Sequence, residues 1–310
     1  MSADLGRTSE WLGLAGHAGE VATAAFHPGG RFVASGGRDG TVRVWDLGRG
    51  RRGGPRDRAI DLGAPLVAVR WDPRGEHLAA LDQAGRLRVF VAATLSPLWE
   101  AAPYHGTKGD ARFAIDGHRL AVAGRDGAIR IYAHPSGALI DEWAAHDGVV
   151  NALAFHPAGA YLASGGADGA VRLWSLATRA LTRAMTHHAG QILALDFHRD
   201  GRHLASGSLD KAAFVWDIER DALVREYHLH AGFVTACRFH PRAEVLATGS
   251  NDSTLKFWDF SKPGPRQLGN FKRADWTIHE IDFDPRGRLM AAASSDDALR
   301  IWDLRNRTRS

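Results

Sequence analysis

The chain has 310 residues, a formal net charge of +4 and 45% hydrophobic residues, with a single cysteine, Cys237. No apolar run reaches the ~18 residues that a membrane-spanning helix requires, and one cysteine excludes an intramolecular disulfide and a cysteine-based metal centre. The first residues, MSADLGRTSEWL, lack the charged start and apolar core of a secretory signal. We therefore expect a cytoplasmic protein without membrane partners, and the same features fit a nuclear one.

A unit of short apolar runs recurs seven times, most completely between His146 and Trp174. This stretch reads HDGVVNALAFHPAGAYLASGGADGAVRLW, with three runs separated by a His-Pro turn and a Gly-Ala-Asp-Gly turn. Each run is too short for a helix and is bounded by Gly, Pro or Asp, which favour turns. The unit therefore predicts short antiparallel strands.

The last aromatic residue of each unit recurs every 42 to 45 residues. A fixed period of this size with four strands per unit is typical of a propeller blade. Trp-Asp pairs at 45–46, 216–217, 258–259 and 302–303, together with Gly16-His17, resemble the WD-repeat β-propeller family. We expect an all-β fold, a seven-bladed β-propeller of four-stranded antiparallel blades that forms one domain over residues 1–310. The predicted blades end near Trp45, Phe90, Tyr132, Trp174, Trp216, Trp258 and Trp302.

The two ends of the chain have complementary deficits. Residues 8–15 read as a strand that precedes any unit, and the seventh unit ends at Trp302-Asp303-Leu304 with no outer strand after it. In the resembled family the N-terminal segment supplies the fourth strand of the last blade. The resemblance therefore implies that residues 8–15 close the ring by pairing two open edges.

The blades differ in how well they keep the repeat. Blade one is followed by the Gly- and Arg-rich segment 48–58, which we expect to be a loop. Blades two and three are degenerate, with Leu62 and Tyr104 at the position that other blades give to histidine. Blades four to six are the most complete. The connector SKPGPRQLGN before blade seven shows neither a helical nor a strand period.

Four blades repeat a His, a Ser or Thr, an Asp and a Trp at constant offsets. A Ser-His-Asp nucleophile would occur once, beside one cleft, so the repetition argues against catalysis, and we expect a protein that is not an enzyme. The resemblance implies instead a buried hydrogen-bonded tetrad that ties three strands of a blade together. The expected tetrads are His17, Ser35, Asp39 and Trp45; His146, Ser164, Asp168 and Trp174; His188, Ser206, Asp210 and Trp216; and His230, Thr248, Asp252 and Trp258.

Other patterns suggest cofactor or metal chemistry only superficially. The 16 histidines are spread over different blades, so no set of metal ligands is evident in the sequence. The Gly-rich turns lead into strands rather than into a helix N-terminus, which a phosphate-binding loop needs. Cys237 falls within an apolar strand, where a buried inert thiol is expected. We therefore expect no cofactor and no metal site.

Arginines gather in the turns that the resemblance places on one face of the ring. A nucleic-acid or ribonucleoprotein-associated module that uses this face is the alternative function. Acidic residues share the face, and a codon bias towards arginine explains the same pattern. The arginines are Arg31, Arg74, Arg199, Arg202, Arg242, Arg286 and Arg288.

The favoured function is a non-enzymatic scaffold, a monomeric propeller that docks proteins or peptides within a larger complex. In the resembled family partners commonly contact residues just after the tetrad His and just before the tetrad Asp. Val149 and Phe233 could instead turn inward and pack between blades. The corresponding positions here are Arg38, Arg125, Val149, Leu209 and Phe233, with Trp276 in the matching turn of blade seven.

Overall fold

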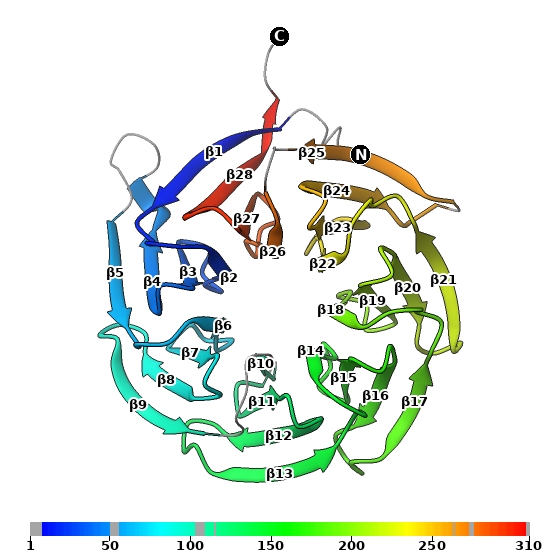
Figure 1. The fold of residues 1–310 in the computed structure, drawn as a ribbon, viewed down its shortest axis with the longest axis horizontal. Helices are drawn as coiled ribbons and strands as arrows, with labels where there is room; N and C mark the ends of the chain where they lie inside the picture. The colour runs from blue at the N-terminus through cyan, green and yellow to red at the C-terminus, as the bar shows by residue number, and fades with distance from the viewer. Residues whose placement is uncertain are drawn as a thin grey trace.

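Seven four-stranded antiparallel sheets stand side by side around a central axis (Figure 1), which confirms the predicted all-β seven-bladed propeller. The computed structural model describes residues 8–307 except 50–55, 103–108, 115, 263 and 273–275. Within those ranges the only helical element is the 3₁₀ turn η2 (Leu47–Arg49), and no helix is long and apolar enough to cross a membrane.

Blades one to six each contain four consecutive strands, and the first of them lies nearest the axis. Blades one to three are β2 (Val21–Phe26), β3 (Phe32–Gly37), β4 (Thr41–Asp46) and β5 (Arg56–Asp61); β6 (Leu66–Trp71), β7 (His77–Asp82), β8 (Leu87–Val91) and β9 (Ser96–Ala101); and β10 (Asp110–Phe113), β11 (Arg119–Ala123), β12 (Ala128–Ala133) and β13 (Leu139–Ala144). Blades four to six are β14 (Val150–Phe155), β15 (Tyr161–Gly166), β16 (Val171–Ser175) and β17 (Leu181–Met185); β18 (Ile192–Phe197), β19 (His203–Ser208), β20 (Ala213–Asp217) and β21 (Ala222–Tyr227); and β22 (Val234–Phe239), β23 (Val245–Ser250), β24 (Thr254–Asp259) and β25 (Arg266–Lys272).

Blade seven combines the two ends of the chain. Its inner strands are β26 (Ile278–Phe283), β27 (Leu289–Ser294) and β28 (Ala298–Arg307), and its outer strand is β1 (Thr8–Ala15). The pairing of β1 with β28 is antiparallel and aligns Leu14 with Leu299 and Ala15 with Ala298. Figure 1 shows the blue β1 lying along the red β28. The N-terminal strand thus covers an edge of β28 that would otherwise present unpaired backbone groups.

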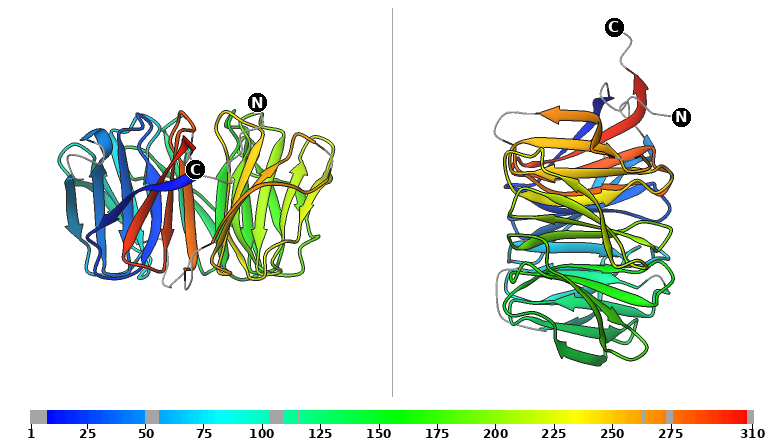
Figure 2. Two further views of the ribbon diagram at one scale, coloured as in Figure 1. Left: turned by 90° about the horizontal axis from the view of Figure 1, so that it is seen from above. Right: turned by 90° about the vertical axis from the view of Figure 1, so that its right-hand side faces the viewer.

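The apolar core is divided among the contacts between neighbouring blades. Val171 and Leu173 of blade four, for example, pack in one cluster with Ile192 and Leu195 of blade five. Because a blade buries its faces only against its neighbours, the closed ring is the unit that folds. Figure 2 shows the result, a disc whose strands run between two faces.

Two segments expected to lack strands contain them. The connector prediction is wrong for residues 266–270, which begin β25, and the loop prediction for 48–58 is wrong for 56–58, which begin β5. Residues 50–55 of that segment lie outside the described part. Both strands are outermost in their blades and bury few side chains, so backbone pairing, rather than an apolar alternation visible in the sequence, holds them in place.

Alternating strand directions define the two faces of the disc. The loop before each inner strand and the turn between the second and third strands open on one face, called the tetrad face because it carries Asp39, Asp168, Asp210 and Asp252. The turn after each inner strand and the turn between the third and fourth strands open on the other, called the opposite face.

Candidate docking faces and central channel

In blade four, a hydrogen-bonded chain joins two strands to the loop before the inner strand and to a turn. Trp174 Nε1 on β16 donates to Ser164 Oγ on β15 over 2.8 Å, and His146 Nε2 lies 2.7 Å from the same oxygen. His146 Nδ1 lies 2.9 Å from Asp168 Oδ1 in the turn. The same contacts occur in three further blades, in the sets His17–Ser35–Asp39–Trp45, His188–Ser206–Asp210–Trp216 and His230–Thr248–Asp252–Trp258.

The protonation of these tetrads follows from their burial. Burial lowers the pKa of His146, as it does for the other three tetrad histidines, so the imidazoles are neutral at pH 7. Burial alone would raise the pKa of Asp39, but hydrogen bonds from the backbone N–H groups of Thr41 and Ala18 lower it to about 2. A neutral ring can therefore donate from Nδ1 to an ionised Asp and accept at Nε2 from the Ser hydroxyl.

The burial of the tetrads indicates a structural role. Ser35, Ser164 and Ser206 have no exposed surface, so a substrate could not reach their hydroxyl groups. Cys237 is also buried, and burial raises the pKa of its thiol well above its ordinary value, which keeps it protonated. These groups stabilise strands rather than offer a nucleophile.

We predict that His146→Ala lowers the free energy of unfolding by about 1–3 kcal/mol, because it leaves Ser164 and Asp168 without their partner. Leu62→Ala, at the corresponding position of blade two, should cost only the packing of a half-buried side chain. Urea midpoints of the two variants measure the difference. An unchanged midpoint for His146→Ala would contradict the stabilising role of the tetrad.

The prediction that Trp276 is an exposed docking residue is wrong. Its side chain is 3% exposed, its ring packs against Trp302 with centroids 5.6 Å apart, and its Nε1 donates to Asp296 Oδ1 over 3.3 Å. Blade seven has Ala292 where the four tetrad blades have Ser or Thr, and Ala292 belongs to the same buried cluster. The small residue leaves room that the indole fills, so Trp276 bonds to the turn Asp in place of a histidine. Ala274, which the sequence spacing aligns with the tetrad histidines, lies outside the described residues.

The remaining predicted docking residues lie on the tetrad face, on five different blades. Arg38, Arg125 and Phe233 are exposed, whereas Val149 and Leu209 are half-buried. Arg38 is paired with Glu20, and it lines a cavity of about 250 Å³ at this end of the channel with Leu193 and other residues. Its charge is therefore partly neutralised within the chain.

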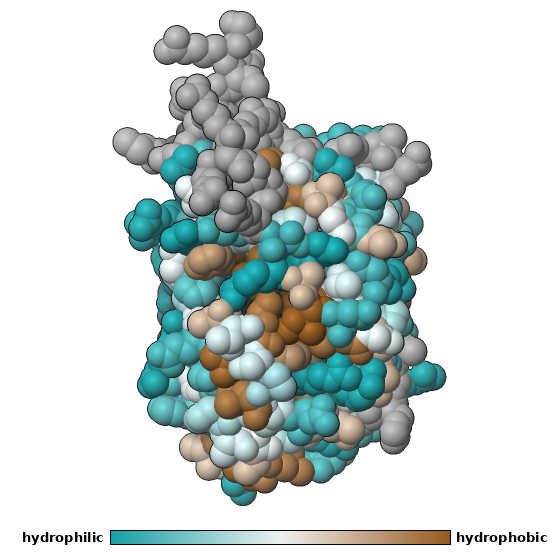
Figure 3. All heavy atoms as spheres, turned by 90° about the vertical axis from the view of Figure 1, so that its left-hand side faces the viewer, coloured by the Kyte–Doolittle hydropathy of each residue, from teal (hydrophilic) through white to brown (hydrophobic). Residues whose placement is uncertain are grey.

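Phe233 has an exposed apolar neighbour in its own loop. Between β21 and β22, Leu229 is 53% exposed and Phe233 is 41% exposed. The Phe233 backbone N–H donates to Asn251 Oδ1 over 2.5 Å, which links the loop to the adjacent turn of blade six. Sequence reasoning missed Leu229 because it stands between His228 and the tetrad residue His230. The other exposed large hydrophobic residues that the structure describes all lie in outer strands: Leu98, Leu139, Ile140 and Leu181. Figure 3 shows apolar surface on one side of the rim.

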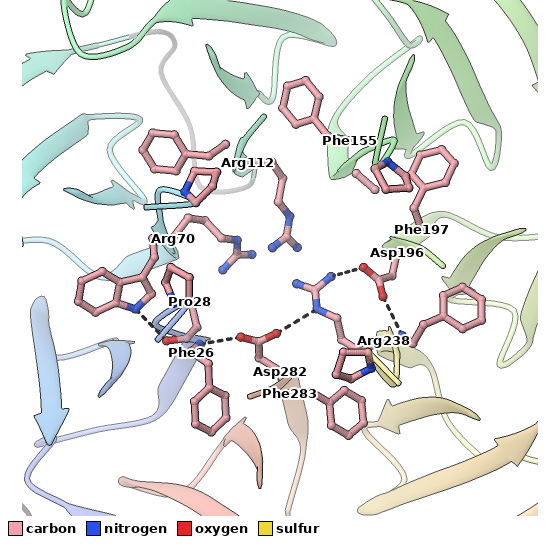
Figure 4. A pocket seen from close by; sticks show the side chains of 18 of the residues that line it. Phe26, Pro28, Arg70, Arg112, Phe155, Asp196, Phe197, Arg238, Asp282 and Phe283 are labelled. Atoms are coloured by element: carbon pink, nitrogen blue, oxygen red, sulfur yellow. Dashed lines mark hydrogen bonds and ion pairs between the residues drawn. The ribbon is translucent and has the colours of Figure 1, made fainter. Parts of the chain in front are cut away.

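A cavity of about 510 Å³ opens at the channel mouth on the opposite face (Figure 4). Each blade contributes to it the aromatic residue that ends its inner strand, and prolines of the following turns, such as Pro28 and Pro157, lie beside them. The aromatic residues recur with the spacing of the blades, which is the signal that could have revealed them in the sequence. They are Phe26, Trp71, Phe113, Phe155, Phe197, Phe239 and Phe283.

Charged side chains cross the channel below this mouth. Figure 4 shows the guanidinium groups of Arg70, Arg112 and Arg238 pointing toward the centre from blades two, three and six. Glu280 Oε1 of blade seven lies 2.7 Å from Arg70 Nη2 and 3.3 Å from Arg238 Nη2. Arg112 Nε lies 3.0 Å from Asp110 Oδ2. The network joins neighbouring blades and also connects blades two and seven, which are not neighbours in the ring.

The carboxylates of the channel differ in pKa. Burial would raise the pKa of Glu280, but the three arginines outweigh it and lower the pKa to about 2. Asp282 is also buried, and there burial outweighs Arg238 and raises the pKa to about 6. Glu280, at the centre of the network, is therefore ionised at pH 7.

Comparison with known proteins fits this architecture. The family model "WD domain, G-beta repeat" matches residues 10–46, 137–175, 179–217, 222–259 and 266–303, more than half of the chain. The chain belongs to the WD-repeat family. The matched segments leave out residues 47–136, which contain the degenerate blade two and the first three strands of blade three.

Three WD-repeat relatives match part of the chain. Transcription initiation factor TFIID subunit 5 of Caenorhabditis elegans is 33% identical over 102 residues, 32% of this chain and 15% of the relative. The small ribosomal subunit protein RACK1 of Medicago sativa is 39% identical over 70 residues, 23% and 20% of the two chains. The target of rapamycin complex subunit wat1 of Schizosaccharomyces pombe is 33% identical over 88 residues, 28% and 27% of the two chains. Each match thus covers less than a third of either protein.

The Trp-Asp motif of this WD-repeat propeller accounts for three of the seven arginines on its arginine-rich face. Arg31, Arg202 and Arg288 pair with the motif residues Asp46, Asp217 and Asp303, each 15 positions further on, at 2.6, 2.5 and 2.9 Å. Arg199 pairs with Glu244. Arg74, Arg242 and Arg286 are exposed. More than half of the arginines of this face are therefore held by carboxylates of the chain itself.

Proposed function

We propose that this WD-repeat propeller is a non-enzymatic docking platform for protein partners, and that the tetrad face around blade six is its docking surface. The observation that carries the proposal is the exposure of Leu229 and Phe233 in one loop. Large apolar side chains exposed in one loop gain free energy when a partner covers them, and aromatic residues are frequent anchors of interfaces.

Hydrogen bonds fix the conformation of the loop that carries Leu229 and Phe233. His230, between the two apolar residues, belongs to the blade-six tetrad, and the Lys256 ammonium donates to the Leu229 carbonyl. A loop that is fixed before binding loses less conformational entropy when a partner docks. The tetrad therefore supports docking by keeping Leu229 and Phe233 in place.

The relatives support a role in an assembly. Two of their names describe a subunit of a transcription initiation factor and a subunit of a target of rapamycin complex, and a third describes a ribosomal subunit protein. A rigid disc with loops on both faces suits such a component. The nucleic-acid alternative has less support, because phosphate binding needs unpaired cations and four of the seven arginines on the opposite face are paired.

We expect the double variant Leu229→Ala, Phe233→Ala to lose at least ~10-fold in partner capture, since hot-spot truncations typically cost ≥ 2 kcal/mol. The full-length protein serves as bait in an extract of its own organism, and captured proteins are quantified by mass spectrometry. Because both side chains are exposed, the melting temperature should hardly change.

The matched control is Leu139→Ala, Ile140→Ala in β13. These residues are 51% and 48% exposed, so the control removes as much exposed apolar surface from the rim as the test variant removes from the tetrad face. Capture should survive in the control. Equal capture by wild type and the Leu229, Phe233 variant, or loss only in the rim variant, would refute the proposed surface.

A further inference from the structure

Three potential metal ligands converge on the opposite face, at the contact of blades two and three. They are Asp72 in the turn after β6, His77 at the start of β7 and His134 just after β12. His134 Nε2 lies 3.1 Å from His77 Nδ1, which lies 3.7 Å from Asp72 Oδ2. One ligand atom from each residue falls within 4.8 Å of the other two. Asp72 and His134 are buried, and His77 is half-buried.

The spacing matches that of a zinc coordination sphere. Zinc binds His nitrogen and carboxylate oxygen at about 2.0–2.2 Å, so neighbouring ligand atoms of a tetrahedral site lie roughly 3.3–3.6 Å apart. The two measured separations lie close to that range on either side. The separation between the Asp72 and His134 ligand atoms is no more than 4.8 Å, so small side-chain rotations would bring all three atoms to one ion.

His134 stands where the repeat otherwise has an apolar residue. Two positions after the last aromatic of each blade, the other six blades have Leu47, Ala92, Leu176, Ile218, Phe260 and Leu304. His134 is 7% exposed, and its Nδ1 is buried without a hydrogen-bond partner among the described residues. The ring has a neutral partner at Nε2, His77 Nδ1, but a polar ring in an apolar position still costs free energy, which a stronger partner at Nε2 would offset. The packing requirements of the blade therefore do not account for a histidine here.

Asp72 is held so that one oxygen faces the histidines. Its Oδ1 accepts the His77 backbone N–H over 2.8 Å, which leaves Oδ2 directed at the His77 ring. In blade seven the equivalent Asp284 uses Oδ1 in the same way for the Leu289 N–H, but Leu289 and, from the following blade, Leu47 occupy the positions of His77 and His134. The turn is thus a common structural element, and only blades two and three add two imidazoles to it.

We propose that Asp72, His77 and His134 form a zinc site that links blades two and three. Asp72 Oδ2, His77 Nδ1 and His134 Nε2 are the ligands, and the fourth position is open to water or to a group from a partner. Two histidines and one carboxylate with an open position form a donor set that zinc commonly accepts. Because His134 comes from a different blade than the other two ligands, the ion bonds the two blades that have the fewest tetrad residues.

A second cluster, His198, Asp200 and His203, provides an internal control. There Asp200 Oδ2 lies 2.9 Å from His198 Nδ1 and 2.7 Å from His203 Nδ1, so hydrogen bonds already satisfy both rings. All three residues belong to one blade and its turn, and Asp200 is exposed. Zinc at this cluster would link nothing and would have to displace two short hydrogen bonds.

Titration of the EDTA-treated and dialysed full-length protein with ZnCl₂, followed by isothermal calorimetry, tests the proposal. We expect one zinc per chain, a higher melting temperature with zinc because the ion binds the folded state, and a tetrahedral visible spectrum when CoCl₂ replaces ZnCl₂. His134→Leu restores the residue type of the other blades and should weaken zinc binding at least tenfold while preserving the fold. His203→Phe, in the second cluster, should leave zinc binding unchanged.

If His134→Leu does not fold, His77→Asn, at a half-buried position, gives the same comparison. The proposal is wrong if the wild-type protein binds no zinc, if the folded ligand variant binds zinc as tightly as wild type, or if His203→Phe abolishes the binding instead.

Discussion

Replacing Glu280 with glutamine is expected to lower the free energy of unfolding by roughly 3–5 kcal/mol, the usual cost of removing one partner from a buried ion pair. Glu280 accepts from Arg70 and Arg238 and lies 3.6 Å from Arg112 Nη2. Without its charge, three arginines from three blades would face one another across the channel with less compensation. The desolvation cost of each guanidinium group would then be offset less, and the mutual repulsion of the three charges would destabilise the ring.

The measurement is the urea midpoint of the purified variant against wild type. Glu100→Gln is the matched control, because Glu100 also pairs with an arginine, Arg88, but is largely exposed. An exposed pair contributes no more than about 1 kcal/mol, so the control should unfold close to wild type. Equal midpoints for all three proteins would show that the channel network contributes little to stability.

Deleting residues 1–15, which include β1, should lower the melting temperature by on the order of 10 °C or cause aggregation. The deletion removes Leu14, which has no exposed surface, from the cluster between blades seven and one. It also leaves β28 without the strand that pairs with its outer edge. Exposed edges of this kind pair readily with other chains.

Thermal melting and light scattering of the truncated protein provide the test, and deletion of residues 1–7, which leaves β1 intact, is the control. The shorter deletion should behave like the full chain. A protein lacking β1 that melts at the wild-type temperature and stays monomeric would mean that ring closure does not depend on the N-terminal strand.

The fold could be predicted because the blades repeat the same pattern of turns and short strands. Turn residues such as Gly and Asp recur at fixed offsets, and the aromatic residue that ends the third strand recurs with them. The outer strands β5 and β25 escaped prediction because they bury few side chains and are held by backbone pairing. An alternation of apolar residues in the sequence indicates buried side chains, so it cannot predict strands that bury few of them.

The tetrads could be anticipated from the family resemblance, whereas the channel and the zinc ligands could not. Arg70 and Glu280 are 210 positions apart, and only the closed ring brings them together. His77 and His134 are 57 positions apart and belong to different blades. Trp276 was misplaced because the tetrad of blade seven is eroded, and its replacement depends on space that is visible only in three dimensions. Departures from the repeat, such as charged residues in inner strands and His134 in an apolar position, were the usable signals.

Hydrogen–deuterium exchange of the full-length propeller, alone and with its captured partner, tests the docking proposal most directly. The account predicts slower exchange of the backbone amides of residues 228–233 and of the adjacent turn 251–253 in the complex, with the turns of the opposite face unchanged. Protection confined to the opposite face or to the outer strands, with residues 228–233 exchanging as in the free protein, would contradict it.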